Sequence, residues 1–141
     1  MKQLFKTVGA MSVAVGFMAA VHSAAAHHST TMFDHSKTMT IKGTVVELRW
    51  TNPHVSLLVH GTVNDGDEPT DWLLEMTSPG NLVRAGGWSR TAVKPGDRVQ
   101  VEMSPLRDSE KHGGALKKVT LIETGQSFTA NLREQERPGL E

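Results

Sequence analysis

The stretch Ile41–His60, with the sequence IKGTVVELRWTNPHVSLLVH, decides the fold that we predict for this chain. Apolar and polar residues alternate in its first half and again in its second half, which is typical of half-buried β-strands. Asn52-Pro53-His54 separates the two halves, and because proline lacks an N–H and has a fixed φ, we expect the chain to turn there. The stretch therefore predicts two strands, Ile41–Trp50 and Val55–His60, joined at a corner.

The apolar positions of the first predicted strand do not all fall on one face. Val46, Leu48 and Trp50 share one alternation, whereas Ile41 is out of phase with them. Because Gly43 lies between, we predict a β-bulge at Gly43 that curves the strand and brings Val46 to the core. A long, curved first strand is how a small barrel begins.

Three further strands and one short helix are predicted downstream. Ser78-Pro79 is typical of a helix start, and Gly86-Gly87 of a helix end. The predicted elements are strands Asp71–Met76, Arg98–Met103 and Ala115–Glu123 and helix Asn81–Ala85. The order β-β-β-α-β-β favours a mainly β, five-stranded OB-like barrel, with an open β-sandwich as the alternative. The predicted core contains Val46, Leu48, Trp50, Leu57, Val59, Trp72, Leu74, Val99 and Val101.

The predicted domain organisation comprises one folded domain and three flanking or terminal segments. Residues 1–26 combine a basic start, an apolar run and small residues before the predicted cleavage point, which indicates a cleaved signal peptide. The apolar run is too short for a comfortable membrane span, so we expect no stable membrane anchor. Residues 27–40 form a polar N-terminal arm, 41–124 the barrel and 125–141 a C-terminal tail. We expect the mature protein in the bacterial periplasm.

Composition excludes several classes of function. Removal of residues 1–26 takes away two lysines and leaves 13 basic against 15 acidic residues, a net charge of −2. A weakly acidic domain is a poor binder of phosphate backbones, so we expect no nucleic-acid partner. The chain has no cysteine, which excludes thiolate metal sites and thiol nucleophiles. It also contains none of the common nucleophile-elbow, phosphate-loop or zinc-helix motifs, and we assign no catalytic residue.

Several short motifs occur together in one order along the chain. They are His27-His28-Ser29, Phe33-Asp34, Trp50-Thr51-Asn52-Pro53-His54, Trp72-Leu73-Leu74-Glu75, Gly87-Trp88 and Pro95-Gly96-Asp97. This set resembles a family of small exported bacterial proteins catalogued only as a domain of unknown function, and the resemblance covers nearly all of the mature chain. It implies an exported single domain and supplies no catalytic residues.

Two consecutive histidines follow the predicted cleavage point. Cleavage after Ala26 makes His27 the terminal residue, and its free amine and imidazole are then expected to chelate one metal ion. A further imidazole would complete the coordination of that ion. Cleavage after Ala25 leaves Ala26-His27-His28, where an amine, two deprotonated amides and an imidazole form a square-planar site that suits Cu(II) or Ni(II). Either cut predicts a copper-competent terminus using His27 or His28, and the other interpretation is a polar tail without a metal.

His54 is a further candidate because it follows Pro53 at the corner between strands. It is interpreted either as a third metal ligand or pocket group, or as a residue that braces the corner by bonding a backbone carbonyl. The possible pocket around it contains Asp34, Trp50, Asn52 and Glu75. Asp34, Glu75 and His54 are also a set of acid–base side chains, but any small domain contains such a triplet, and no motif in the sequence supports catalysis by it.

Two functions from different classes follow from the sequence. The first is a periplasmic copper-binding module that uses the mature N-terminus. The second is a metal-free OB-like module that binds an envelope protein or a small ligand across its barrel face.

Overall fold

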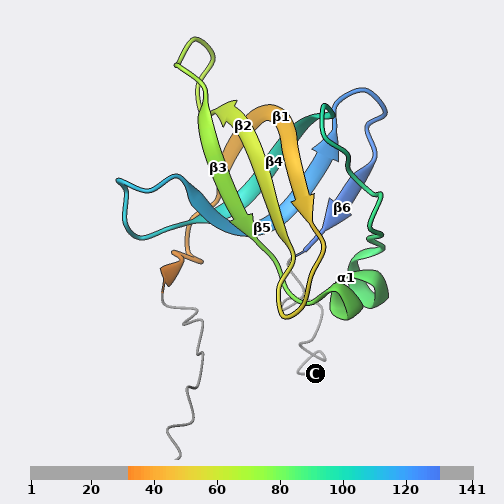
Figure 1. Ribbon diagram of the computed structural model, residues 1–141. Helices are drawn as coiled ribbons and strands as arrows, with labels where there is room; N and C mark the ends of the chain where they lie inside the picture. The colour runs from red at the N-terminus through yellow and green to blue at the C-terminus, as the bar shows by residue number, and fades with distance from the viewer. Residues whose placement is uncertain (1–31, 131–141) are drawn as a thin grey trace, which may run out of the picture.

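The computed structural model describes residues 32–130, which form six β-strands and one α-helix (Figure 1). The elements are β1 (Met39–Arg49), β2 (Ser56–Thr62), β3 (Thr70–Glu75), α1 (Pro79–Gly86), β4 (Arg98–Pro105), β5 (Gly113–Leu121) and β6 (Ser127–Thr129). The predicted signal peptide lies outside the described residues.

The first five strands close into a barrel. The sheet order is β3-β2-β1-β4-β5-β6, and a parallel pairing between β3 and β5 joins its two sides. With α1 between β3 and β4, this is the OB-like arrangement that the sequence predicts. The pairing of β3 with β5 excludes the open β-sandwich, because a sandwich leaves those strands in separate sheets.

The bulge of β1 lies three residues beyond its predicted position. Gly43 pairs regularly with Gly61 and Val99, whereas the register with β2 shifts between Val45 and Glu47. Val46 is the extra residue, and its side chain is 43% exposed, so its prediction as a core residue is wrong. Val45 takes the buried position instead. Alternation in a sequence reveals that a bulge exists but not which of two adjacent valines it displaces.

Gly43 serves the close approach of β1 and β2. A Cβ atom built on Gly43 lies 2.7 Å from the Cα of Gly61, and still closer to the backbone oxygen of His60. Real carbon atoms do not approach so closely, and both neighbours belong to the backbone. The glycine pair therefore allows the two strands to pass at a distance that side chains would forbid.

The barrel interior contains most of the predicted core. Leu57, Val59, Leu74, Val99 and Val101 are fully buried, Trp72 is nearly so, and Leu48 and Trp50 pack against them from partly exposed positions. Apart from Val46, the predicted core is confirmed.

Helix α1 begins and ends at the predicted signals. Ser78 accepts a hydrogen bond from the backbone N–H of Asn81 (3.3 Å), Pro79 is the first helical residue, and Gly87 adopts a left-handed conformation with φ of 67°. The helix is longer at both ends than Asn81–Ala85, because Pro79, Gly80 and Gly86 also have helical geometry. Its apolar residue Leu82 is buried against the core.

β6 lies within residues 125–141, which the sequence analysis assigned to a tail. Its three residues pair with Lys118–Thr120. The indole N–H of Trp88 donates to the carbonyl oxygen of Thr129 (2.8 Å), and its ring packs on Phe128 at 5.3 Å between centroids. A strand this short has no periodicity of its own, so tertiary contacts decide that it forms.

Candidate functional site

A groove of about 720 Å3 opens between three segments that are distant in sequence. They are the end of the β2–β3 hairpin, the β4–β5 loop (residues 106–112) and the segment before β1 (residues 32–38), which we call the arm. Figure 1 shows the hairpin and the loop projecting beyond the body of the barrel. The apolar part of the lining includes Met39, Val63, Trp72 and Leu106. Such a mixture of apolar surface and charged side chains is typical of binding sites.

The arm is held against the β4–β5 loop by its backbone. Phe33 forms an isolated antiparallel bridge with Leu106, the N–H of Asp34 donates to the carbonyl oxygen of Pro105 (2.8 Å), and that of Arg107 donates to Met32 (2.9 Å). The Phe33 side chain is buried. The bridge and the buried ring together fix the arm at one edge of the groove.

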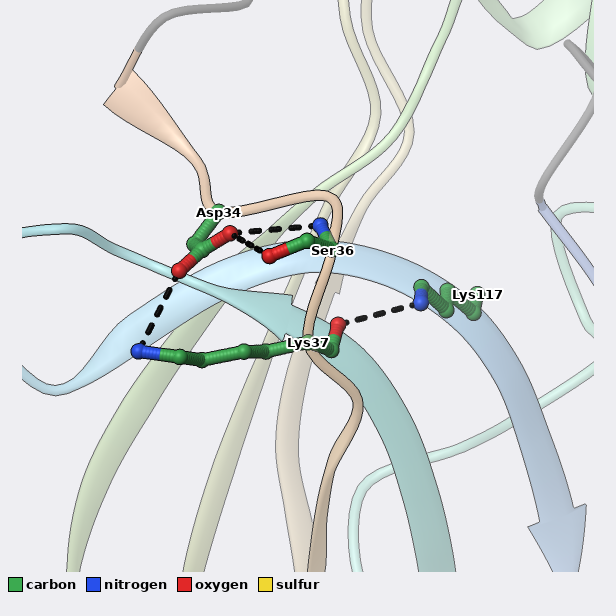
Figure 2. Close-up of polar contacts among 4 residues, drawn as sticks. All are labelled: Asp34, Ser36, Lys37 and Lys117. Carbon is green, nitrogen blue, oxygen red and sulfur yellow. Dashed lines mark hydrogen bonds and ion pairs between the residues drawn. The ribbon is translucent and has the colours of Figure 1, made fainter.

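Asp34 folds the arm into a tight turn (Figure 2). Its carboxylate accepts hydrogen bonds from the hydroxyl (2.5 Å) and the N–H (3.2 Å) of Ser36, and it pairs with the ammonium of Lys37 (3.3 Å). The hydrogen bond from the Ser36 hydroxyl, aided by Lys37, lowers the pKa of Asp34 below its ordinary value. Asp34 is therefore ionised at neutral pH and engaged by its neighbours.

Lys117 of β5 fastens the same turn to the barrel. Its ammonium donates to the carbonyl oxygen of Lys37 (3.1 Å) and to the hydroxyl of Thr38 (2.7 Å), and Figure 2 shows the former bond crossing from β5 to the arm. Lys117 therefore holds the arm through a backbone carbonyl and a hydroxyl, and not through an ion pair with an acid.

Trp72 is the largest side chain in the groove lining. Its indole N–H donates to the carbonyl oxygen of Gly61 (3.1 Å), which satisfies its polar atom. The ring of His112 packs edge-on against it with 4.9 Å between centroids. Trp72 is thereby held in one orientation, and because it is 7% exposed, only a small part of the ring lines the groove.

The two walls of the groove differ in charge. The hairpin contributes Asp67 and Glu68, and the amide of Asn64 donates to Asp67 (2.9 Å). The opposite loop contributes Arg107 and Lys111. Lys111 is paired with Asp108 (3.4 Å), which lies outside the lining, and Lys37 is paired with Asp34, which lies within it.

The predicted site residues do not gather in one place. Asp34 lines the groove, whereas Trp50, Asn52, His54 and Glu75 do not. The corner between β1 and β2 lies beside α1, at the end of the barrel opposite the hairpin tip (Figure 1). The seven residues of β2 run from the corner to the hairpin, and at about 3.3 Å per residue they separate these two ends of the barrel by roughly 20 Å.

His54 occupies the corner as a bracing residue. Its Nδ1 lies 3.1 Å from the carbonyl oxygen of Met76, and the preceding Asn52–Pro53 bond is cis. Trp50 is half-buried against the core, Asn52 is exposed, and Glu75 lies in the ladder between Ser56 and Ala115. The bond to a backbone carbonyl corresponds to the second of the two interpretations of His54.

Within residues 32–130, no three His, Asp or Glu side chains are grouped so that they could hold a metal ion. His27 and His28, the principal copper ligands predicted, lie outside the described residues. Helices long and apolar enough to cross a membrane are likewise absent from this part of the chain.

Sequence reasoning missed most of the groove. Val63, Thr70, Leu106 and His112 are ordinary residues with no characteristic spacing, and they meet only after the barrel closes. The polar composition of residues 105–114 was a weak signal, since long polar loops on small barrels often carry binding residues.

Comparison with known proteins gives one match. Neither a curated protein nor a solved structure matches the chain. A family described as "Family of unknown function (DUF6152)" matches residues 15–115, which include the arm, the corner and the groove. Because this match spans more than half of its length, the chain belongs to that family of unknown function.

Proposed function

We propose that the chain is an exported, metal-free binding module and that its groove holds a segment of another envelope protein. The observation that carries this proposal is the groove itself, with its volume of about 720 Å3 and its lining of apolar and charged side chains from three distant segments. Export rests on the predicted signal peptide over residues 1–26.

The chemistry of the groove favours binding over catalysis. Asp34 is the acid of the arm, and its carboxylate is engaged by Ser36 and Lys37. An acid whose pKa is lowered by such partners is a poor proton donor at neutral pH. Val63 lines the groove and is 44% exposed, so it supplies apolar surface that a partner can cover.

A peptide probe tests the proposal. A library of random twelve-residue peptides displayed on phage is selected against the mature protein, and the strongest binder is synthesised for titration by fluorescence polarisation. Val63 lines the groove and is 44% exposed, while Ile122 is 42% exposed and lies outside it. We expect Val63→Ser to weaken binding roughly 5–10-fold, because about 1 kcal/mol of apolar contact is lost.

Ile122→Ser is the matched control, and it should leave the affinity within about twofold of the parent, which is less than 0.5 kcal/mol. If the two variants behave alike, or if no selected peptide depends on Val63, the groove is not the binding site and the proposal fails.

A second candidate function is copper binding at the mature N-terminus, and the observation that favours it is the His27-His28 pair after a predicted cleavage point. His54 contributes less readily than the sequence alone suggests, since its Nδ1 lies against Met76. The test is titration of the periplasmic protein with Cu(II), followed by intact mass. One extra residue ahead of the mature terminus moves the amine and should abolish tight binding; equal binding by the extended protein rejects this function.

A further inference from the structure

Strand β3 is paired along its whole length on one side only. Its antiparallel register with β2 runs without a shift from Thr70 to Glu75, whereas its parallel pairing with β5 covers only Leu73–Glu75. The N–H of Leu73 donates to the carbonyl oxygen of His112 (3.3 Å), where the β4–β5 loop leaves the sheet. The first half of β3 therefore has an edge without a β5 partner.

The backbone of Asp71 faces that edge. Successive residues of a strand direct their N–H and C=O groups to opposite sides, so Asp71 has the same orientation as Leu73. The N–H of Met76 donates to the carbonyl oxygen of Val55, the residue just before β2. The backbone groups of the even-numbered residues of β3 therefore face β2, on the side opposite the free edge. Thr70 and Trp72, on either side of Asp71, line the groove. The groove thus adjoins one backbone donor and one acceptor that are available to an added strand.

We propose that an extended, basic peptide segment binds by adding a short strand to this edge of β3, inside the mouth of the groove. The inference rests on the proposed binding function and names its mode and its ligand chemistry. Strand addition uses main-chain hydrogen bonds for affinity and alternate side chains for specificity. Alternate side chains of the added segment face the apolar part of the lining, in which Val63 is the exposed residue.

Charge selects a basic segment. Residues 64–71 contain four acids, namely Asp65, Asp67, Glu68 and Asp71, and no Lys or Arg. Asp71 pairs with His60 (2.8 Å) and Asp67 accepts from Asn64, while Glu68 forms no ion pair within residues 32–130. Across the groove, Lys111 of the loop is paired with Asp108 and Lys37 of the arm with Asp34, while Arg107 of the same loop also lines the groove. A Lys or Arg side chain of the ligand therefore lies opposite Glu68.

The ligand backbone provides the first test. The synthetic display-selected peptide is prepared as a set in which each amide nitrogen is methylated in turn, which removes one donor at a time. Strand addition at Asp71 predicts one large loss, roughly 5–10-fold, at the single position whose N–H donates to the Asp71 carbonyl, and smaller losses at its two neighbours, whose N–H groups face away. Equal losses at that position and at its neighbours overturn strand addition, whereas the dependence on Val63 reports separately on the groove.

The protein backbone provides the second test. Asp71→Pro removes the outward N–H while the bonds to β2, made by Thr70 and Trp72, remain, and proline is tolerated at such edges. Asp71→Ala is the matched control, because it also loses the pair with His60 but keeps the N–H. We expect at least about fivefold weaker peptide binding for Asp71→Pro than for Asp71→Ala. Equal affinities with unchanged circular dichroism overturn the proposal; a variant that does not fold leaves the decision to the methylated peptides.

Charge reversal in the hairpin tests the ligand chemistry. Glu68 lines the groove, whereas Asp65 is an exposed acid of the same hairpin that does not. We expect Glu68→Lys to weaken binding of the peptide several-fold more than Asp65→Lys, and the difference to shrink at high salt. Equal effects of the two reversals overturn the assignment of a basic residue opposite Glu68.

Discussion

The two ends of the β2–β3 hairpin differ in how they are built. At the corner end, Pro53 and His54 belong to one short motif, and His54 contacts the backbone of Met76. At the groove end, Trp72, Leu106 and the arm come from three distant segments and surround open space. The corner has the rarer residues and performs a structural role, while the groove has ordinary residues and offers a binding surface. Unusual residue types are therefore a poor guide to function when a turn requires them.

The largest expected effect concerns the glycine pair below the groove end. Gly43→Ala should destabilise the protein by about 3 kcal/mol, since the new Cβ meets backbone atoms that cannot move aside. Gly80→Ala is the control, because nothing lies within 4 Å of its Cβ position, and it should be neutral or slightly stabilising. Urea denaturation of both variants measures the difference. Similar midpoints would mean that β1 and β2 do not approach closely at Gly43.

The next effect tests the bulge that separates the two faces of β1. Val101→Ala should cost about 1–3 kcal/mol, because Val101 is fully buried and leaves a cavity. Val46→Ala should cost about 0.5 kcal/mol or less, since Val46 is on the surface. The two denaturation midpoints, measured side by side, decide the register. A larger loss for Val46 would restore the bulge at Gly43.

His54 and His112 compare the two ends directly. His54→Ala should cost roughly 0.5–1.5 kcal/mol of stability through its lost bond to Met76, without changing affinity for the selected peptide. His112→Ala removes the ring that packs on Trp72, and it should weaken peptide binding a few-fold with a smaller effect on stability. Thermal unfolding and fluorescence polarisation on the same samples separate the roles. Weaker peptide binding by His54→Ala would assign the ligand to the corner.

The smallest effect concerns pH at the arm. The folded-state pKa of Asp34 is lowered by Ser36 and Lys37, so the ionised form stabilises the turn. That contribution is fully present above the unfolded-state pKa and is lost as the pH falls through the folded-state pKa. An NMR titration of the Asp34 carboxyl should give a midpoint below that of an unstructured peptide. Asp34→Asn should remove this part of the acid sensitivity, and Asp108→Asn of the β4–β5 loop serves as the control. An Asp34 midpoint equal to that of an unstructured peptide would contradict the hydrogen-bonded turn.

Much of the barrel was predictable from local patterns. Alternation identified β2, β3 and β4, and Ser78, Pro79 and Gly87 marked the ends of α1, because strand faces and helix caps depend on residues a few positions apart. The corner at Pro53 followed from a single residue with restricted backbone geometry. The signal peptide and the copper terminus stay predictions, since they concern residues outside those described.

The sequence by itself determined the order of β1 to β5 with α1, most of the core and the place of the corner. Only the tertiary structure decided that Val46 is the displaced residue of β1, that Ser127–Thr129 pairs as β6, and that the arm meets the β4–β5 loop. The physical reason is the range of the interactions. Alternation and capping act within one segment, whereas a bulge, a short edge strand and a groove depend on partners that are distant in the chain and become neighbours only when the barrel closes.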